Sequence, residues 1–445
     1  MKIVNYNKKI NKFRFPKFEL EKINSRITIA YYPQKTDFFS YLQISLTEFY
    51  YPENIDGLAY FTASMIKKTT QNKTKEFITE YLENRGSIFS ISVSHDAITL
   101  FLKTLPEYFE ESIDIVTDCL FNPAFNPNEI EKHKSIQIAD LQQDLNEPSF
   151  LCSQALDQLI FNGHFYSSPI SGTEKSLKNI QSKDCINFHN DLINNSKVNI
   201  IVGGKYKRKI IEKKLNQIIQ NFNQKRQKKF IPQKISKIDS NKIIFINKKI
   251  QQAALKIAKQ TINFRHKDSI PILFINTIFG GYFMSRLNAL IREKHGYTYG
   301  IYSNYINYKF ASLLTITSTI NAKVLYDALQ KIFEQMNIIS IEKINNKEFQ
   351  TVKNYFLGYF LRSIETTSKI IEKINSIILY DLDINYFNIL YNKIQNLTID
   401  QIYPIQKKYF KPEKLNISIV GNKKTILNQL EKLHGYELIQ KSKPL

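Results

Sequence analysis

The stretch VNIIVGG, residues 198–204, decides the fold, because it returns near the end of the chain as LNISIVGN, residues 415–422. Each copy is a short apolar run that ends in glycine, which predicts a buried β-strand followed by a turn. The predicted elements before the two copies also follow one another in the same order. A repeat of just over 200 residues predicts an internal duplication into two domains and excludes a solenoid of short units.

Both halves mix strands with helices. Alternating apolar and polar residues predict strands at 26–33, 39–46, 87–105 (a hairpin that turns at His95 and Asp96) and 300–320 (also a hairpin). Apolar residues at helical spacing predict helices at 57–68, 74–86, 108–121, 126–147, 322–336 and 345–364. The predicted class is therefore α+β. We expect one domain at 1–223, a second at 243–445, and a Lys/Gln-rich linker at 224–242.

The bulk composition is that of a folded protein with more than one core. The chain has 445 residues, of which 43% are hydrophobic, and this length suits two or more domains. Its net charge of +22 raises the hypothesis of a nucleic-acid binder. The lysines, however, are spread along the whole chain together with asparagine and isoleucine, and no nucleic-acid motif accompanies them. We therefore attribute the charge to bulk composition and expect no nucleic-acid partner.

Cysteine usage and the N-terminal stretch predict a location. Cys119, Cys152 and Cys185 lack CxxC spacing, which is typical neither of a disulfide framework nor of a zinc knuckle, and they indicate a reducing compartment. The first residues are basic but lack the apolar core of a signal peptide. No apolar run reaches the ~18 residues of a membrane-spanning helix. These features predict a cytoplasmic protein with no membrane contact.

The helix that begins in GLAYFTASMIKKTT, residues 57–70, has the frame of a metal-binding helix without the ligands. Two histidines four residues apart share one helical face and can hold zinc together, and in the order HxxEH the glutamate serves as general base. Here the three positions are Tyr60, Ala63 and Ser64. None is a good zinc ligand, and alanine cannot accept a proton. No two histidines of the chain are four residues apart, so we expect no metal on this chain.

This stretch resembles the HxxEH helix of the insulinase/pitrilysin-type (inverzincin) peptidases, whose pattern is GLAHFLEHMxFxGT. The likeness extends from about residue 15 to residue 430. It implies two homologous domains, each a largely antiparallel sheet with helices packed on one face. It also implies that the third zinc ligand of the family, a glutamate in a long helix, corresponds to Asp140. The carboxylate is kept at this position, but it is one methylene shorter and its metal partners are absent.

The second half carries the more specific motif. FGGYFMSRLNALIREKHGYTYGIYSNY, residues 279–305, resembles the family pattern LGGGMSSRLFxxLREKRGLAYSV. That pattern holds an arginine and a tyrosine seven residues apart, which fall here on Arg292 and Tyr299. The resemblance implies that both point into the cleft, bind substrate and stabilise the oxyanion of the scissile carbonyl. An arginine fork and a phenolic hydroxyl are suitable donors for that charge.

One half of an active site is therefore missing and the other half is present. In the bacterial heterodimers of this family, one subunit carries HxxEH and the other carries the Arg/Tyr pair. The resemblance thus implies the zinc-less subunit of a heterodimeric zinc endopeptidase, inactive alone, similar to the non-catalytic alpha subunit of the mitochondrial processing peptidase. Zinc is expected on the HxxEH-bearing partner. Two alternatives stay open: a pseudoenzyme that serves only as a scaffold or peptide-binding module, and a basic nucleic-acid binder.

Several candidate residues also have plain structural explanations. Gly280 and Gly281 are expected to permit close backbone packing or a helix-start turn, with a substrate loop as the alternative. Asp140 is expected to be a relic that faces a polar cavity. His133 lies seven residues before it on nearly the same helical face, so a makeshift metal site is the alternative to a solvated surface. Tyr60 is expected to fill the space left by the metal.

Overall fold

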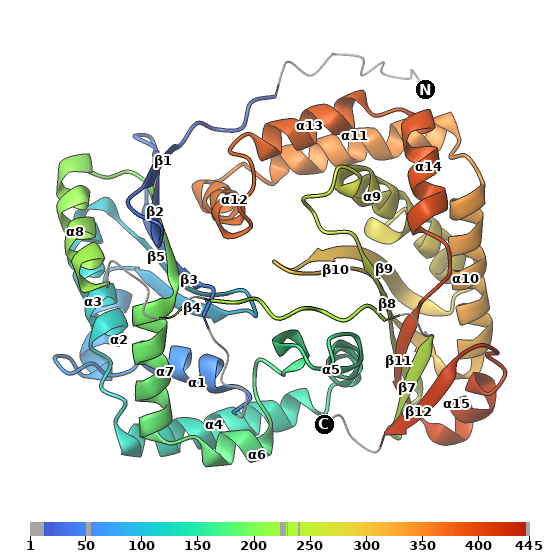
Figure 1. Cartoon of the computed structure of the whole chain (residues 1–445), viewed down its shortest axis with the longest axis horizontal. Coiled ribbons are helices and arrows are strands. Elements are labelled where there is room, and N and C mark those ends of the chain that lie inside the picture. Colours follow the sequence, from blue (N-terminus) through green and yellow to red (C-terminus); the bar gives the residue numbers. More distant parts are fainter. Residues whose placement is uncertain (1–12, 50–54, 223–227, 229, 239–240, 442–445) are drawn as a thin grey trace.

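Two six-stranded sheets with their helices form the two halves of the molecule (Figure 1). The computed structural model describes residues 13–49, 55–222, 228, 230–238 and 241–441. One sheet is built from each half of the sequence, which confirms the predicted α+β fold with two related domains. The predicted linker at 224–242 falls partly on residues outside the described ranges, so the domain boundaries stay a prediction.

The strands of the first sheet are β1 (Glu19–Lys22), β2 (Ile27–Pro33), β3 (Ser40–Thr47), β4 (Ile88–Val93), β5 (Ala97–Thr104) and β6 (Lys197–Gly204). The helices of this half are α1 (Leu58–Ile66), α2 (Lys75–Glu83), α3 (Phe109–Phe121), α4 (Pro127–Asp144), α5 (Pro148–Ile160), α6 (Glu174–Asn179), α7 (Ser182–Asn195) and α8 (Arg208–Asn221).

The strands of the second sheet are β7 (Lys242–Asn247), β8 (Gln252–Thr261), β9 (Thr298–Asn307), β10 (Ser312–Asn321), β11 (Asn416–Gly421) and β12 (Glu437–Lys441). The helices of this half are α9 (Ser269–Asn276), α10 (Leu325–Ile341), α11 (Asn346–Arg362), α12 (Thr367–Leu379), α13 (Tyr386–Asn396), α14 (Ile399–Tyr409) and α15 (Lys423–Leu430).

The two sheets share their central topology. The strand order is β1-β2-β6-β3-β5-β4 in the first and β12-β7-β11-β8-β10-β9 in the second. The second and third strands in each order pair in parallel, β2 with β6 and β7 with β11, and the next three pairings are antiparallel. The repeated stretch of the sequence therefore forms the same inner strand twice. The outer strands differ, because β1 pairs antiparallel with β2 whereas β12 pairs parallel with β7.

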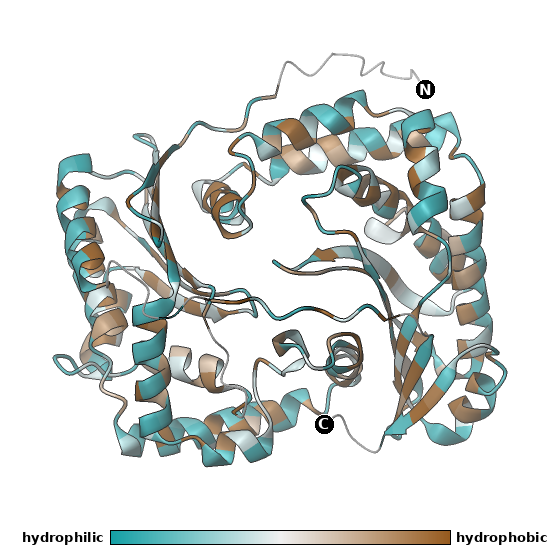
Figure 2. Ribbon diagram, viewed as in Figure 1, coloured by the Kyte–Doolittle hydropathy of each residue, from teal (hydrophilic) through white to brown (hydrophobic). Residues whose placement is uncertain are grey.

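The outer face of each sheet is covered by helices from the same half of the chain. Val198, Ile200 and Val202 of β6 point into a core that α1, α3, α7 and α8 close. Ile417 and Ile419 of β11 point into the matching core beneath α9, α10 and α14. Figure 2 shows these strands largely brown and the solvent side of the outer helices largely teal. Alternation along the strands thus selects the face that each sheet buries.

The inner face of each sheet is covered by a helix from the other half. Helix α5 packs on β8 and β11 of the second sheet, and α12 packs on β3 and β6 of the first (Figure 1). Under α5 the contact is mainly apolar, with Cys152 and Ala155 against Ala254. Under α12, a Cβ on Gly203 would lie 2.6 Å from the Cδ1 of Ile371, so this glycine permits the close approach. The two halves are interlocked by this exchange.

The tips of two hairpins, β4–β5 and β9–β10, meet between the halves. The backbone N–H of Lys309 donates to Oδ2 of Asp96 at 2.8 Å, and the hydroxyl of the buried Tyr166 donates to the other oxygen. Burial raises the pKa of the Asp96 carboxyl, and these two hydrogen bonds oppose the rise. Nζ of Lys309 lies 2.9 Å from Oε1 of Glu48 and 3.8 Å from Oδ2 of Asp381. A satisfied, buried polar network of this kind fixes the relative position of the halves.

The N-terminal segment also joins the halves. Phe13 stacks on Tyr391 of α13 with 4.5 Å between ring centroids, and Phe15 packs on Phe387 at 5.1 Å. The backbone N–H of Phe15 donates to Oδ1 of Asn388 at 2.7 Å. The chain thus crosses the helices of the second half before it forms the first sheet.

Replacing Phe15 with alanine should lower the free energy of unfolding by about 3 kcal/mol, because the change removes a buried ring and leaves a cavity. Urea unfolding followed by circular dichroism measures this loss. Phe38→Ala is the matched control, since Phe38 is 81% exposed and its loss should cost less than about 0.5 kcal/mol. Equal losses in the two variants would contradict a stabilising role for the N-terminal segment.

Candidate functional site

Helix α1 carries the three positions of the expected zinc motif. It begins after Gly57, whose φ of 83° favours glycine, and a Cβ there would lie 2.6 Å from the Cα of Gly172. Tyr60 is 39% exposed, whereas Ala63 is 1% exposed and belongs to the core of the first half. Ser64 is half-buried. Ala63, which stands at the position of the general base, is therefore buried in the core, whereas Tyr60 lies at the surface.

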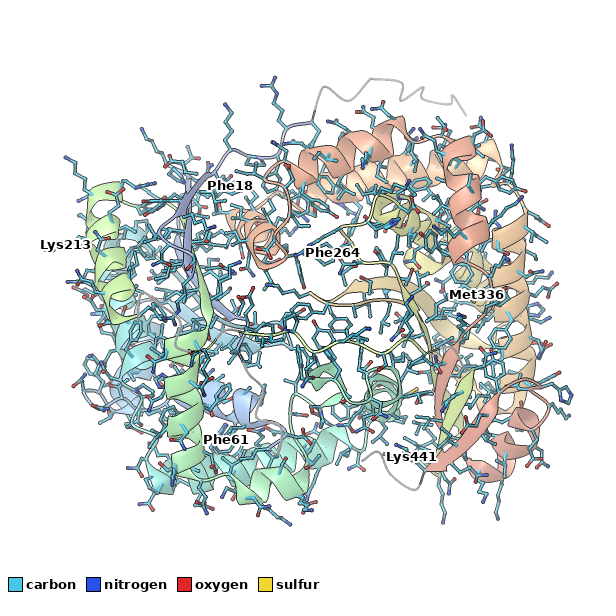
Figure 3. The ribbon with its side chains drawn as sticks, in the orientation of Figure 1. Phe18, Phe61, Lys213, Phe264, Met336 and Lys441 are labelled. Carbon is cyan, nitrogen blue, oxygen red and sulfur yellow. The ribbon has the colours of Figure 1, made fainter. Side chains whose placement is uncertain are left out.

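The two candidates on α4 have different environments. Asp140 lies on the exposed face of the helix, whereas the ring of His133 packs on Phe61 of α1 with 5.0 Å between centroids. Figure 3 labels Phe61 at this place in the first half. Both ring nitrogens of His133 are buried and have no hydrogen-bond partner in the described part of the chain. Among the described residues, no hydrogen bond joins Asp140 to His133.

The residues around α1 do not fit a zinc ion. Tyr60, Ala63 and Ser64 offer no imidazole, thiolate or carboxylate, and a structural or catalytic zinc needs at least three such donors. Across the described ranges, no three His, Cys, Asp or Glu side chains gather where they could share a metal ion.

Lowering the pH from about 6.5 toward 4 should destabilise the native state. Burial lowers the pKa of His133 to about 4 from 6.5, Lys68 adds to the shift, and Asp140 opposes it. Between these values the unfolded chain binds a proton that the native chain does not, so stability falls as the pH falls. Burial also lowers the pKa of His95, His164 and His189, which acts in the same direction.

Urea unfolding midpoints across this pH window test the histidine contribution. His133→Leu should flatten the pH dependence, because it removes one of the groups that must stay neutral. His434→Gln is the control, since His434 is exposed. A pH dependence unchanged by His133→Leu would show that this histidine does not contribute.

The second half presents its candidate residues from two π-helical segments, η3 (Thr277–Gly281) and η4 (Asn288–Lys294). Such segments are rare and frequently lie at functional sites. Gly280 lies at the end of η3, where a Cβ would be 2.6 Å from the Cβ of Ser303 and 2.8 Å from its backbone nitrogen. Gly280 therefore serves close packing against β9, while Gly281 is exposed beside it.

Two buried asparagines fix these segments to β9. Asn288 donates from Nδ2 to the carbonyl of Ile301 at 2.8 Å and accepts from the Ile301 N–H at 3.2 Å. Asn276 donates to the carbonyl of Ser303 at 2.9 Å and accepts a hydrogen bond from its hydroxyl. The sequence interpretation missed both residues, because asparagine is common throughout this chain. They hold the strand that carries Tyr299 and the segment that carries Arg292.

Arg292 lies in η4 with its side chain partly exposed. Its NH1 is 2.8 Å from Oε1 of Glu293, and its guanidinium lies 4.3 Å from the ring centroid of Phe283. The aromatic face and the neighbouring carboxylate hold the guanidinium at the surface. An exposed ion pair of this kind contributes little stability, so a stronger anionic partner can replace Glu293.

Tyr299 lies on the edge strand β9 and is 91% exposed. The β9–β10 register shifts between Ser318 and Ile320, opposite Tyr299, and such a bulge re-aims a side chain at a sheet edge. Further aromatic rings lie on the neighbouring loop and on α11. Tyr282 packs at a tilt on Tyr355, and Tyr355 stacks on Tyr359, with ring centroids 4.7 Å and 6.1 Å apart. The predicted pair is thus presented from adjoining elements, η4 and β9.

Two family models match the chain in sequence. Residues 28–174 match the model described as Insulinase (Peptidase family M16), and residues 179–356 match the model described as Peptidase M16 inactive domain. This chain belongs to the M16 peptidase family. As an M16 protein it carries the α1 frame without HxxEH and keeps the arginine and tyrosine seven residues apart, Arg292 and Tyr299.

Relatives of this M16 chain include proteins from bacteria and from eukaryotes. It is 23% identical over 316 residues to the uncharacterized zinc protease YmxG of Bacillus subtilis, which covers 70% of this chain and 75% of that protein. It is 26% identical over 382 residues to the non-peptidase homolog YmxG of Helicobacter pylori, which covers 81% and 84%. A crystal structure of a peptidase M16 inactive domain from Pseudomonas fluorescens superposes with a TM-score of 0.82 at 19% identity, over 91% of this chain and 98% of that one.

The structural likeness supports the M16 fold for both halves. At that level of identity it shows the fold alone, so the roles of Arg292 and Tyr299 stay predictions. No helix in the described ranges combines the length and the apolar character that crossing a membrane requires.

Proposed function

We propose that this chain is the zinc-less subunit of a heterodimeric zinc metalloendopeptidase. Its partner is an HxxEH-bearing subunit of the same family, which supplies the zinc, the general base and the attacking water. The observation that carries the proposal is the exposure of Tyr299, which is 91%. The strand that carries it is fixed by the side-chain amides of Asn276 and Asn288, and helix α1 of the same chain lacks the zinc ligands. An exposed phenol on a rigid support contributes little to folding and is available to a second molecule.

The chemistry assigned to this chain is recognition of developing negative charge. When water attacks a scissile carbonyl, the carbonyl oxygen becomes an oxyanion. The Tyr299 hydroxyl donates one hydrogen bond to it, and the Arg292 guanidinium supplies a fixed cation with several donors. Asn276 and Asn288 act as positioning residues, because they hold β9 and η4 without reaching the substrate. Preorganised donors need no rearrangement when the charge forms.

Further observations support a chain that works without its own zinc and inside the cell. The Helicobacter pylori relative is named a non-peptidase homolog, which is consistent with a member that lacks peptidase activity alone. Cys119, Cys152 and Cys185 are free and buried, which suits the reducing cytoplasm.

One observation favours the pseudoenzyme alternative. Arg292 already has Glu293 as a counter-ion and Phe283 as a stacking partner. If these two contacts keep Arg292 from the substrate, Tyr299 and the neighbouring aromatic rings bind a peptide or a partner without assisting the reaction.

A peptidase assay with a quenched, mixed-sequence peptide tests the proposal. We expect cleavage only when this chain and an HxxEH-bearing partner are mixed, and we expect a zinc chelator to abolish it. Each protein alone is the control. Chelator-sensitive cleavage by this chain alone would refute the interpretation of Tyr60, Ala63 and Ser64. A mixture that associates but cleaves nothing would leave the scaffold alternative.

A further inference from the structure

A pocket of about 800 Å³ is lined by residues of the second half of the chain. Its walls come from the C-terminal end of α11, from α12, from the start of α13 and from Asn307 at the end of β9. Phe264, labelled near the middle of the molecule in Figure 3, forms part of one wall. Neither the emptied zinc motif nor the Arg292/Tyr299 pair lines this pocket. It is therefore a second candidate site.

The walls of the pocket are rich in aromatic rings, which include Tyr359, Tyr380, Tyr386 and Phe387. Burial raises the pKa of the Tyr386 hydroxyl and raises that of Tyr380 to about 12. These shifts indicate surroundings of low polarity, where a charged phenolate is disfavoured. An apolar side chain of a ligand would find matching surfaces here.

A half-buried ammonium lies among these rings. Nζ of Lys373 is 4.9 Å from the ring centroid of Phe387 and 5.4 Å from that of Phe360. Burial lowers its pKa, and Glu372 opposes the shift. Within the described residues, no carboxylate forms an ion pair with Lys373. An ammonium that has lost water without gaining a counter-ion is stabilised when an anion binds beside it.

Arg362 adds a second cation to the same pocket. Its guanidinium is exposed and has no ion pair in the part of the chain that the structure describes. The third cation, Lys369, already pairs with Oε2 of Glu365 at 3.6 Å. Glu372 also lines the pocket and opposes an anion. Among the described residues, Arg362 and Lys373 thus lack an ion-pair partner, and so does Glu372. The net charge of these three side chains is positive by one, which favours a ligand with a single negative charge.

We infer that this pocket binds the carboxylate of a peptide, with an aromatic or aliphatic side chain next to it. The peptide nature of the ligand rests on the proposed function. Strand β9 runs from the Tyr299 end to Asn307 at the pocket, and eight extended residues span about 26 Å. A bound peptide would therefore place its carboxylate about eight residues from the bond held at Arg292 and Tyr299. A C-terminal carboxylate and an acidic side chain share this chemistry.

Isothermal titration calorimetry on the isolated chain tests the inference with three short, acetylated peptides of alanine and serine that end in phenylalanine. The first has a free C-terminal carboxylate, the second is amidated, and the third is amidated with glutamate before the phenylalanine. The free acid should bind about tenfold more tightly than the plain amide, as expected for a charge-assisted contact. Equal binding of the glutamate amide assigns an acidic side chain, and weaker binding assigns the C-terminus.

Four variants locate the binding. Lys373→Gln and Arg362→Gln should each weaken binding of the free acid about tenfold, and Glu372→Gln should strengthen it. Lys393→Gln removes the same charge from an exposed position of α13 outside the pocket and should leave the affinity unchanged. Thermal unfolding confirms that each variant is folded.

Equal affinity for the free acid and the plain amide would overturn the inference, and so would an absence of binding to all three peptides. A loss with Lys393→Gln as large as with Lys373→Gln would also overturn it, because binding would then follow net charge alone. The titration uses neither the partner subunit nor zinc. A mixed peptidase assay without activity would therefore refute the catalytic proposal while carboxylate-dependent binding at this pocket still stood.

Discussion

Arg292→Ala and Tyr299→Phe should each lower kcat/KM of the mixed complex by roughly 10²- to 10³-fold, the usual effect of removing one oxyanion donor. Tyr299→Phe removes only a hydroxyl from a residue that is 91% exposed, so the fold should be unaffected. Arg292→Lys should recover only part of the activity lost in Arg292→Ala, because an ammonium lacks the planar fork. Steady-state kinetics with a quenched peptide measure these effects. A fall in kcat at nearly constant KM would indicate a contact made chiefly in the transition state.

Matched controls separate this effect from general changes of charge or surface. Lys294→Ala removes an exposed cation from the same π-helical segment, and Tyr326→Phe removes a phenolic hydroxyl from α10. Both should leave kcat/KM within about twofold of the parent complex. Full activity in both Arg292→Ala and Tyr299→Phe would remove the proposed role and favour the scaffold alternative.

Lys309→Met should lower the free energy of unfolding by about 3 kcal/mol, because it leaves Glu48 and Asp381 with less compensation at the junction of the halves. The methionine keeps the apolar stem and the backbone N–H that donates to Asp96. The loss should appear in the midpoint of urea unfolding.

Lys323→Met is the control for this prediction, since Lys323 is exposed at the opposite end of β10. Its substitution should change the free energy of unfolding by less than about 0.5 kcal/mol. If both variants unfold at the same urea concentration as the parent chain, the network around Lys309 does not stabilise the junction.

Much of the fold could be predicted because its signals are local. The strand at 198–204 and its copy at 415–422 were evident as short apolar runs, and both form inner strands, β6 and β11. Helices α5 and α12 were not predicted, although Ile370, Ile371 and Ile374 of α12 have helical spacing. An apolar stripe shows that a helix will be buried, but it does not show which sheet will cover it.

Some residues of the candidate site could likewise be predicted from the sequence, and others could not. Tyr60, Ala63, Ser64, Arg292 and Tyr299 were found because each lies in a short contiguous motif. Asn276 and Asn288 were not, because their partners are backbone groups of a strand 27 and 13 residues further along. The π-helical turns also leave no periodic signal in the sequence. Positioning residues of this kind can be recognised only when the strand they hold has been located.

The exchange of α5 and α12 has a consequence for the origin of the chain. Each sheet receives its inner helix from the other half, and the two transfers are equivalent under the repeat. Two separate copies of one half would perform the same mutual exchange as an isologous homodimer. Gene fusion would then have joined two polypeptides that were already entwined. If the gene were split between the halves, neither half would be stable as an independent domain. Each half would expose the apolar inner face of its sheet, which a helix of the other half covers.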